Sequence, residues 1–190
     1  MKQAKPSQNL VFIGFRGTGK TTISLECATQ RGAERISTDE QVTKRLGMSI
    51  ADFVQQHGWA EFRRHEHEEI CALWEKYPHS SHNNSAAAFV IDCGGGVVEN
   101  PENMRLLGEL GEIVWIHAEL DDVLSRLLAE PQAQSTNATQ RPLLNAASDM
   151  RSDLIANYTR RLPIYEQYAE RCINTSTMSI QECCRTILRS

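Results

Sequence analysis

Short apolar runs recur along the chain, and glycine or polar residues bound each of them. Continuous apolar runs of this length are typical of strands that are buried on both faces of a sheet. The pattern predicts strands at residues 10–13, 34–37, 88–92, 112–117 and 172–174.

Between these runs lie segments with the spacing, start signals and stop signals of helices. We predict helices at residues 21–30, 40–46, 49–57, 61–76, 120–129, 150–169 and 179–189, the sixth bent near Pro163. Asp39 is the expected cap of the second helix, and Gly47 its stop. Alternating strands and helices predict an α/β fold with a parallel sheet covered on both faces. No internal repeat or linker divides residues 1–190, so we expect a single domain.

A long polar stretch, residues 130–147, has no apolar periodicity. Loops of this length in a compact domain are commonly lids over active sites. We therefore predict a lid here, and it contains Arg141.

Composition and charge exclude several classes of function. The 190 residues carry a net charge of −4, which argues against a nucleic acid backbone as the main partner. The six cysteines form no C-x-x-C pair and no zinc spacing, so we interpret them as reduced thiols of a cytoplasmic protein. Residues 1–9 are polar and no apolar run has the length of a membrane span, so we expect neither a secretion signal nor a membrane partner.

The first predicted strand leads into a phosphate-binding pattern, G-F-R-G-T-G-K-T, whose defining residues are Gly14, Gly19, Lys20 and Thr21. Glycines let backbone N–H groups surround phosphate oxygens, the lysine supplies a positive charge, and the threonine hydroxyl suits Mg²⁺. A nucleoside triphosphate is the expected ligand. The predicted ATP contacts are Gly17, Thr18, Gly19, Lys20, Thr21 and Thr22.

The third predicted strand ends in Asp92 and is followed by Cys93 and three glycines. A buried strand that delivers an aspartate beside a phosphate loop is a common way to orient Mg²⁺ or its water. Consecutive glycines allow the backbone to approach a ligand closely. We therefore predict Thr21 and Asp92 as the residues that hold Mg²⁺.

Several motifs, in this order along the chain, resemble those of the shikimate kinase family. They are G-F-R-G-T-G-K-T-T at residues 14–22, T-D at 38–39, W-A-E-F-R-R-H-E at 59–66, C-G-G-G at 93–96, R-P-L-L at 141–144 and R-L-P-I-Y at 161–165. Apart from the phosphate loop each motif is weak, but the combination is specific.

The resemblance implies a three-layer α/β/α fold with a five-stranded parallel sheet in the order 2-3-1-4-5 and a lid. It implies transfer of the γ-phosphate of ATP to the 3-hydroxyl of shikimate, on the route to chorismate and the aromatic amino acids, with Mg²⁺ as cofactor. We expect a cytoplasmic monomer.

The resemblance also implies roles for particular residues. Lys20, Asp39 and Arg141 are the expected catalytic residues, Asp39 at the reacting hydroxyl and Arg141 over the phosphates from the lid. The substrate contacts would be Asp39, Arg63, Gly95 and Arg161, and the first two lie in a shikimate-binding segment at residues 39–66. Two guanidinium groups give planar, bidentate recognition of a carboxylate.

Four neighbours of these residues need interpretation. Arg161 rather than Arg160 matches the R-x-P-x-Y motif, so Arg160 is expected to be a surface charge. Glu66 is expected to orient Arg63 rather than to act in chemistry. His65 and His67 stand two residues apart on a helix and should point in different directions.

The chain departs from the family pattern in three places. Ser37 stands where the family usually has the first acid of D-[ST]-D, and we hypothesise that Asp92 takes over its role toward Mg²⁺. The loop at residues 175–179 has no arginine for the adenine side, and the lid is longer than usual.

Two other functions remain open. A kinase of the same fold that acts on another metabolite, such as gluconate, would not need two arginines at one carboxylate. A kinase-like domain that binds a ligand without transferring phosphate would account for Ser37. Such a domain would not need to keep Lys20, Thr21, Asp39 and Arg141.

Overall fold

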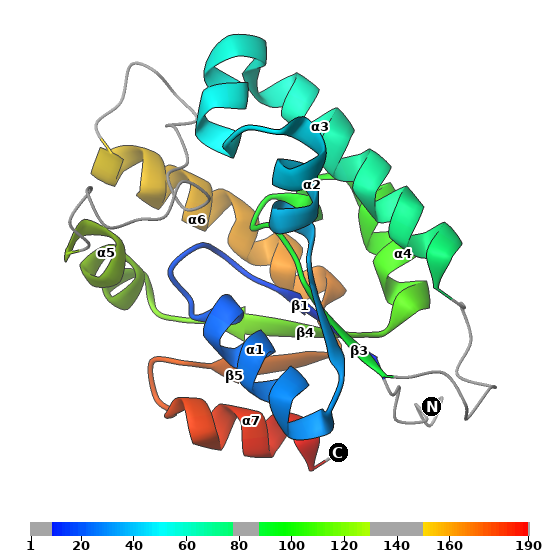
Figure 1. Ribbon diagram of the computed structural model, residues 1–190. Helices are drawn as coiled ribbons and strands as arrows, with labels where there is room; N and C mark the ends of the chain where they lie inside the picture. Colours follow the sequence, from blue (N-terminus) through cyan, green and yellow to red (C-terminus); the bar gives the residue numbers. More distant parts are fainter. Residues whose placement is uncertain (1–8, 78–87, 130–149, 190) are drawn as a thin grey trace.

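The computed structural model describes residues 9–77, 88–129 and 150–189. Its centre is a sheet of five parallel strands in the order β2-β3-β1-β4-β5 (Figure 1). The strands are β1 (Leu10–Ile13), β2 (Glu34–Ser37), β3 (Phe89–Asp92), β4 (Glu112–His117) and β5 (Arg171–Asn174). The predicted sheet and its strand order are confirmed.

The helices are α1 (Lys20–Arg31), α2 (Thr38–Leu46), α3 (Ile50–Lys76), α4 (Pro101–Leu110), α5 (Leu120–Ala129), α6 (Met150–Tyr168) and α7 (Ile180–Leu188), with a short 3₁₀ helix η1 (Val97–Glu99). Most of the predicted helices are confirmed. Three details differ: η1 and α4 were not predicted, the segments at 49–57 and 61–76 form one element α3 with a non-helical Gly58 inside, and the cap of α2 is Ser37. The Ser37 hydroxyl accepts a hydrogen bond from the Glu40 amide at 3.3 Å, so the chain turns into the helix two residues before Asp39.

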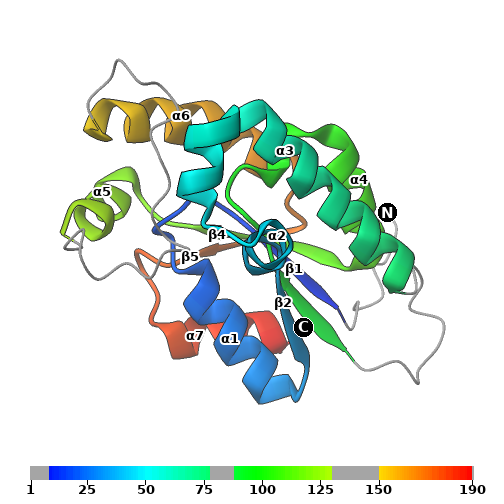
Figure 2. The same ribbon diagram turned by 45° about the horizontal axis from the view of Figure 1, so that its top comes forward.

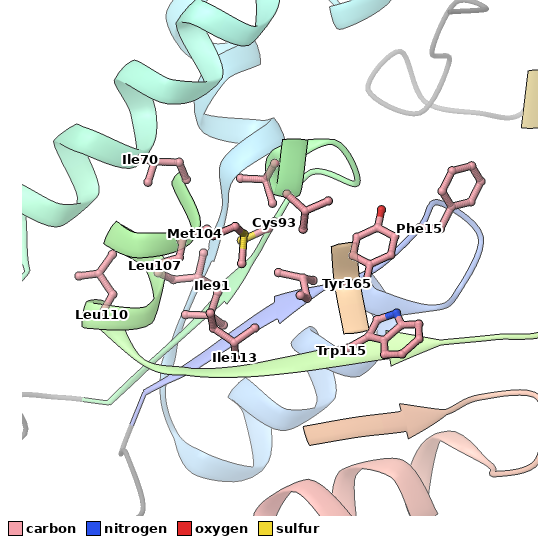
Figure 3. Close-up of a cluster of buried hydrophobic side chains, with 14 of the residues drawn as sticks. Phe15, Ile70, Ile91, Cys93, Met104, Leu107, Leu110, Ile113, Trp115 and Tyr165 are labelled. Atoms are coloured by element: carbon pink, nitrogen blue, oxygen red, sulfur yellow. The ribbon is translucent and has the colours of Figure 1, made fainter. Parts of the chain in front are cut away.

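Helices cover both faces of the sheet, as Figure 2 shows. Along β1 the side chains alternate: Leu10 and Phe12 face α1 and α7, whereas Val11 and Ile13 face the larger layer of α3, α4, α5 and α6. Figure 3 shows part of this larger cluster, which extends from Leu110 to Phe15 beside the phosphate loop. The core therefore holds the loop after β1 in place.

A third apolar cluster joins α2 to the part of α3 on either side of Gly58. Its buried members are Val42, Ile50, Phe53, Val54 and Phe62. The helices that form this small core stand beside the carboxyl ends of the strands (Figure 1), and the core lies within the segment 39–66 predicted to bind substrate. Ligands of open parallel sheets bind at this edge.

Within residues 9–77, 88–129 and 150–189, no helix combines the length and the apolar composition that a membrane span requires.

Candidate active site

The phosphate loop connects β1 to α1 at the carboxyl edge of the sheet. Gly14 has a φ of +143°, and a Cβ atom added there would lie 2.2 Å from the Ile116 carbonyl oxygen, so the loop crosses β4 at a distance that only glycine allows. The Lys20 ammonium donates to the Phe15 carbonyl at 3.0 Å, and the Thr18 hydroxyl donates to the same oxygen at 2.8 Å. The lysine thus lies folded into the loop, where a phosphate group can replace its carbonyl partner.

The end of β3 carries Asp92, which is buried and faces α1. Its Oδ2 atom accepts hydrogen bonds from Arg35 Nη2 at 2.7 Å and from the Ser24 hydroxyl at 3.3 Å. Arg35 also donates to Glu40 at 3.0 Å. Burial alone would lower the pKa of the Arg35 guanidinium, but its bonds to the two carboxylates raise that pKa on balance.

The register of β2 and β3 pairs Ser37 with Asp92. In a parallel pair, partners in register project from the same face of the sheet at a spacing of about 4.8 Å. The carboxylate that the sequence lacks at Ser37 is therefore present on the neighbouring strand. Arg35, two residues before Ser37, shares this face, and its contact with Asp92 was not foreseen because it depends on strand register.

The glycine-rich turn after β3 connects several parts of the site. The Gly94 amide donates to the Thr38 hydroxyl at 3.0 Å, which ties the turn to the start of α2 beside Asp39. Gly95 packs against the phosphate loop, since a Cβ atom there would lie 3.3 Å from the Gly14 carbonyl oxygen. Its own carbonyl accepts a hydrogen bond from the Tyr165 hydroxyl of α6.

Arg63 of α3 and Arg161 of α6 converge beside this turn. Arg63 Nη1 donates to Glu66 Oε2 at 2.8 Å, as expected of a glutamate that orients the arginine. Arg161 is 5% exposed and its guanidinium carbon lies 5.8 Å from the centre of the Phe15 ring in the phosphate loop. The side chain of Arg160 is 53% exposed, in agreement with its expected place at the surface.

A second carboxylate, Glu99 of η1, also reaches the two arginines. Arg161 Nε donates to Glu99 Oε1 at 2.8 Å, and Arg63 Nε lies 3.7 Å from Glu99 Oε2. Burial alone would raise the pKa of Glu99, but the guanidinium groups lower it on balance, Arg161 foremost. Burial raises the pKa of Glu66, and Arg63 offsets only part of that effect.

The predicted site residues divide into three groups. The structure brings the phosphate loop, Gly95, Arg63 and Arg161 together at one edge of the sheet, and Asp39 lies partly buried in the first turn of α2 at the same edge. Thr21 and Thr22 are exposed in the first turn of α1. Arg141 and the predicted lid at 130–147 lie outside the described residues.

Arg126 of α5 was not predicted as a site residue. Its Nη1 atom donates to the Gly17 carbonyl at 3.1 Å, and its Nη2 atom donates to the Thr175 carbonyl at 3.3 Å. The Thr175 hydroxyl in turn donates to the Thr18 carbonyl at 2.9 Å. Arg126 of α5 therefore places a guanidinium group against the loop at 175–179, which has no arginine of its own. This contact depends on the tertiary fold and could not be predicted from the sequence.

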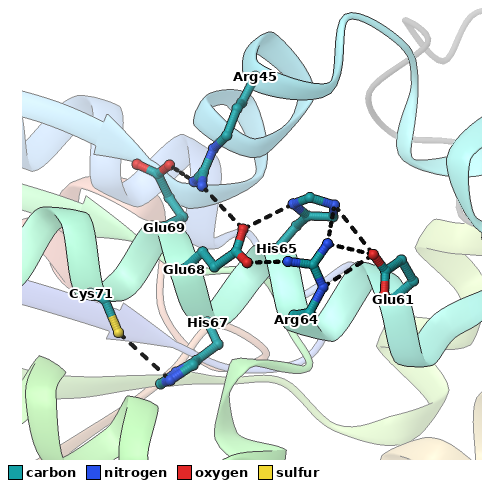
Figure 4. A network of polar contacts seen from close by, with 8 residues as sticks. All are labelled: Arg45, Glu61, Arg64, His65, His67, Glu68, Glu69 and Cys71. Atoms are coloured by element: carbon teal, nitrogen blue, oxygen red, sulfur yellow. Dashed lines mark hydrogen bonds and ion pairs between the residues drawn. The ribbon is translucent and has the colours of Figure 1, made fainter.

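His65 and His67 of α3 belong to separate contacts, as predicted. Figure 4 shows His65 beside Glu61 and Glu68, and His67 directed toward Cys71. Within the described part of the chain, no three His, Cys, Asp or Glu side chains form a cluster that could hold a metal ion.

Comparisons with known proteins agree with this geometry. A protein-family model described as shikimate kinase matches residues 16–190. The chain is 32% identical over 189 residues to a shikimate kinase of Syntrophus aciditrophicus, with 96% of this chain and 90% of the relative covered. It is 34% identical over 177 residues to a shikimate kinase of Xanthomonas axonopodis, with 93% and 88% covered.

Solved structures show the same fold. The shikimate kinase of Aquifex aeolicus superposes with a TM-score of 0.70 at 25% identity, covering 95% of this chain and 94% of that one. The Acinetobacter baumannii shikimate kinase, solved in complex with shikimate, gives a TM-score of 0.77 at 24% identity, with 95% and 90% covered. The chain belongs to the shikimate kinase family.

Proposed function

We propose that the chain transfers the γ-phosphate of ATP to the 3-hydroxyl of shikimate, using the phosphate loop for ATP and the arginine pair for the shikimate carboxylate. The observation that carries the proposal is the convergence of Arg63, beside Gly96, and Arg161, beside Phe15, next to the loop that contains Lys20. Two guanidinium groups at a phosphate loop fit a small acceptor that bears a carboxylate. Gluconate also bears one, so the experiment below includes it.

The roles of the residues follow from phosphoryl transfer. The substrate hydroxyl attacks the γ-phosphorus, the bond to the ADP oxygen breaks, and Asp39 orients the hydroxyl and accepts its proton. Lys20 and Arg141 offset the charge that develops on the phosphoryl oxygens. The Gly95 backbone contacts the substrate. Arg126, which spans the phosphate loop and Thr175, borders the nucleotide.

We infer that Mg²⁺ binds between Thr21 and Asp92. The oxygen donors of these two residues suit a hard cation that keeps several waters and binds phosphate oxygens. Thr21 and Asp92 would together hold the cation, and Arg35, which donates to Asp92 Oδ2, would orient that carboxylate. Mg²⁺ supplies charge neutralisation to the phosphates when bound.

The test is a coupled ADP-release assay with ATP, Mg²⁺ and either shikimate or gluconate. We expect release that depends on shikimate, a loss of at least about 100-fold in kcat for Lys20→Ala, and a raised shikimate KM for Arg63→Ala. Asp92→Ala should raise the Mg²⁺ concentration for half-maximal turnover. Binding of shikimate in a calorimeter without ADP release would contradict the kinase function, and release with gluconate alone would change the substrate.

A further inference from the structure

We propose that Glu99 is a positioning residue for carboxylate recognition: it holds Arg63 and Arg161 by their Nε edges and leaves terminal nitrogens, above all the buried Arg161 Nη2, for the substrate. The inference rests on the function proposed above. Its basis is that the Glu99 carboxylate contacts the Nε atoms of both arginines.

The contacts of Glu99 fall on one edge of each guanidinium. The Nε atom of Arg161 donates to Oε1 at 2.8 Å, and the Nε atom of Arg63 lies 3.7 Å from Oε2. Arg160 also donates to Oε1 from the surface side. An internal carboxylate that took the place of the substrate would be expected at the terminal nitrogens, where bidentate pairing is strongest. The Nε contacts instead leave that position open.

The terminal nitrogens have different surroundings. Arg63 Nη1 is bound by Glu66, while among the described residues the Arg161 Nη2 atom is buried and has no hydrogen-bond partner. A buried donor without an acceptor is unfavourable, and a carboxylate ligand would supply the acceptor. The two arginines therefore present a donor to an anion rather than a closed ion pair.

Glu99 is held rigidly enough to act in this way. It ends η1, where the Val97 amide donates to the Gly94 carbonyl and the Glu99 amide donates to the Gly96 carbonyl, each at 3.1 Å. Val97 and Val98 are buried in the main core. The glycine turn that contacts the substrate thus also fixes the carboxylate that orients the arginines.

Charge supports the same role. Three guanidinium groups surround Glu99, and Glu66 is a second carboxylate on Arg63. Without Glu99, Arg161 would lose its Nε partner and would be free to turn. The cost should fall on binding of the carboxylate rather than on transfer of the phosphoryl group.

The experiment compares Glu99→Ala and Glu99→Gln with Glu102→Ala, a matched control whose carboxylate pairs with Arg105 on the exposed face of α4. We expect Glu99→Ala to raise the shikimate KM, and the Kd from calorimetry, about tenfold, because a charge-assisted hydrogen bond is lost. Glu99→Gln keeps an acceptor, so a rise of about threefold is expected. The kcat, the ATP KM and the melting temperature should change little in both, and Glu102→Ala should match the wild type.

A double-mutant cycle separates positioning from a structural effect. Lysine has no Nε edge of this kind, so in an Arg161→Lys background Glu99→Ala should change the shikimate Kd by less than about twofold. An unchanged or lowered shikimate KM in Glu99→Ala would overturn the inference, a lowered value identifying Glu99 as a competitor of the substrate. Parallel rises in both KM values with a lower melting temperature would also overturn it. A wild type without shikimate-dependent ADP release would instead refute the proposed function, and the inference with it.

Discussion

Gly96 sets how closely Arg63 approaches the turn after β3. A Cβ atom at this position would lie 2.0 Å from Arg63 Nη2, while the backbone φ of −100° suits any residue. The obstacle is the end of a flexible side chain, so Gly96→Ala should fold with its stability changed by less than about 1 kcal/mol. The displaced guanidinium should raise the shikimate KM about tenfold. Steady-state kinetics and urea unfolding measure the two effects.

Gly14 provides the contrasting substitution. There an added Cβ would meet the backbone carbonyl of Ile116 at 2.2 Å, and φ is +143°. Both a shift of strand β4 and a change of this backbone angle cost free energy, so Gly14→Ala should lower the free energy of unfolding by about 3 kcal/mol or more. If Gly96→Ala proved as destabilising as Gly14→Ala, the added methyl group would not be accommodated by movement of the Arg63 guanidinium.

At the scale of residues, the sequence was most informative where a motif encodes its own geometry. Lys20 and Thr21 follow from the phosphate loop alone, and Arg161, which its spacing from Pro163 distinguishes from Arg160, is the buried arginine of the two. The contacts of Arg126 and Glu99 were not predictable, since each joins segments far apart in the chain and neither stands in a diagnostic pattern.

Among the elements, α3 shows that local sequence signals determine where the helix is interrupted, whereas tertiary packing keeps its two parts together. Its two halves were predicted as separate helices, and they meet at Gly58, whose φ of 82° and ψ of 167° are not helical. Packing of both halves against α2 keeps them in one element: Phe53 and Phe62, on either side of the break, share a buried cluster with Val42. The break itself needs a backbone conformation that is almost restricted to glycine.

Replacement of Gly58 by alanine should therefore destabilise the protein by about 1–3 kcal/mol through backbone strain, since no atom lies within 4 Å of the added Cβ. Urea unfolding monitored by fluorescence measures the change. Gly47→Ala is the control: φ is 66° and ψ is 13°, the ordinary left-handed helical region, where alanine costs about 1 kcal/mol. Equal costs at the two positions would argue against a special conformation at Gly58.

Residues 97–111 received no predicted element, although Asn100 and Pro101 are good start signals for a helix and form the N-terminus of α4. The preceding apolar pair, Val97 and Val98, concealed the boundary because two apolar residues fit a strand, a loop or a helix. Only burial of both against the core identifies η1.

At the scale of the whole molecule, the distribution of thiols reports how the layers are packed. Cys27 of α1 and Cys184 of α7 are buried against each other's helices, whereas Cys172 in β5 is exposed. Partial loss of solvent around each sulfur raises the pKa of all three thiols above the ordinary value near 9. Little of the reactive thiolate form is therefore present at pH 8, and its share increases with pH.

We expect a thiol reagent at pH 8 to modify Cys172 in the folded protein and to modify Cys27 and Cys184 only after unfolding, as measured by mass spectrometry of digested samples. Reaction at Cys172 should accelerate with pH. Cys172→Ser is the control, and it should leave the folded protein almost unmodified at these three positions. Modification of Cys27 as fast as Cys172 would mean that α1 and α7 do not form a closed layer.

The overall topology was predictable because alternating strands and helices allow few arrangements, and the family resemblance selected one of them. The larger apolar cluster was not predictable in the same detail, because its partners come from helices that are distant in sequence, as Ile70, Leu107 and Tyr165 do.

The pairing of Ser37 with Asp92 has a consequence for how such sites are compared. Along the chain, Ser37 and Asp92 are 55 residues apart. Across the sheet they stand in one row, on neighbouring strands about 4.8 Å apart, and Asp92 faces α1. In a parallel sheet, the position of a side chain is thus described by its register across the strands and by its face, and not by its place in the sequence alone. When a homologue lacks an expected side chain, a replacement is best sought on the neighbouring strands at the same register.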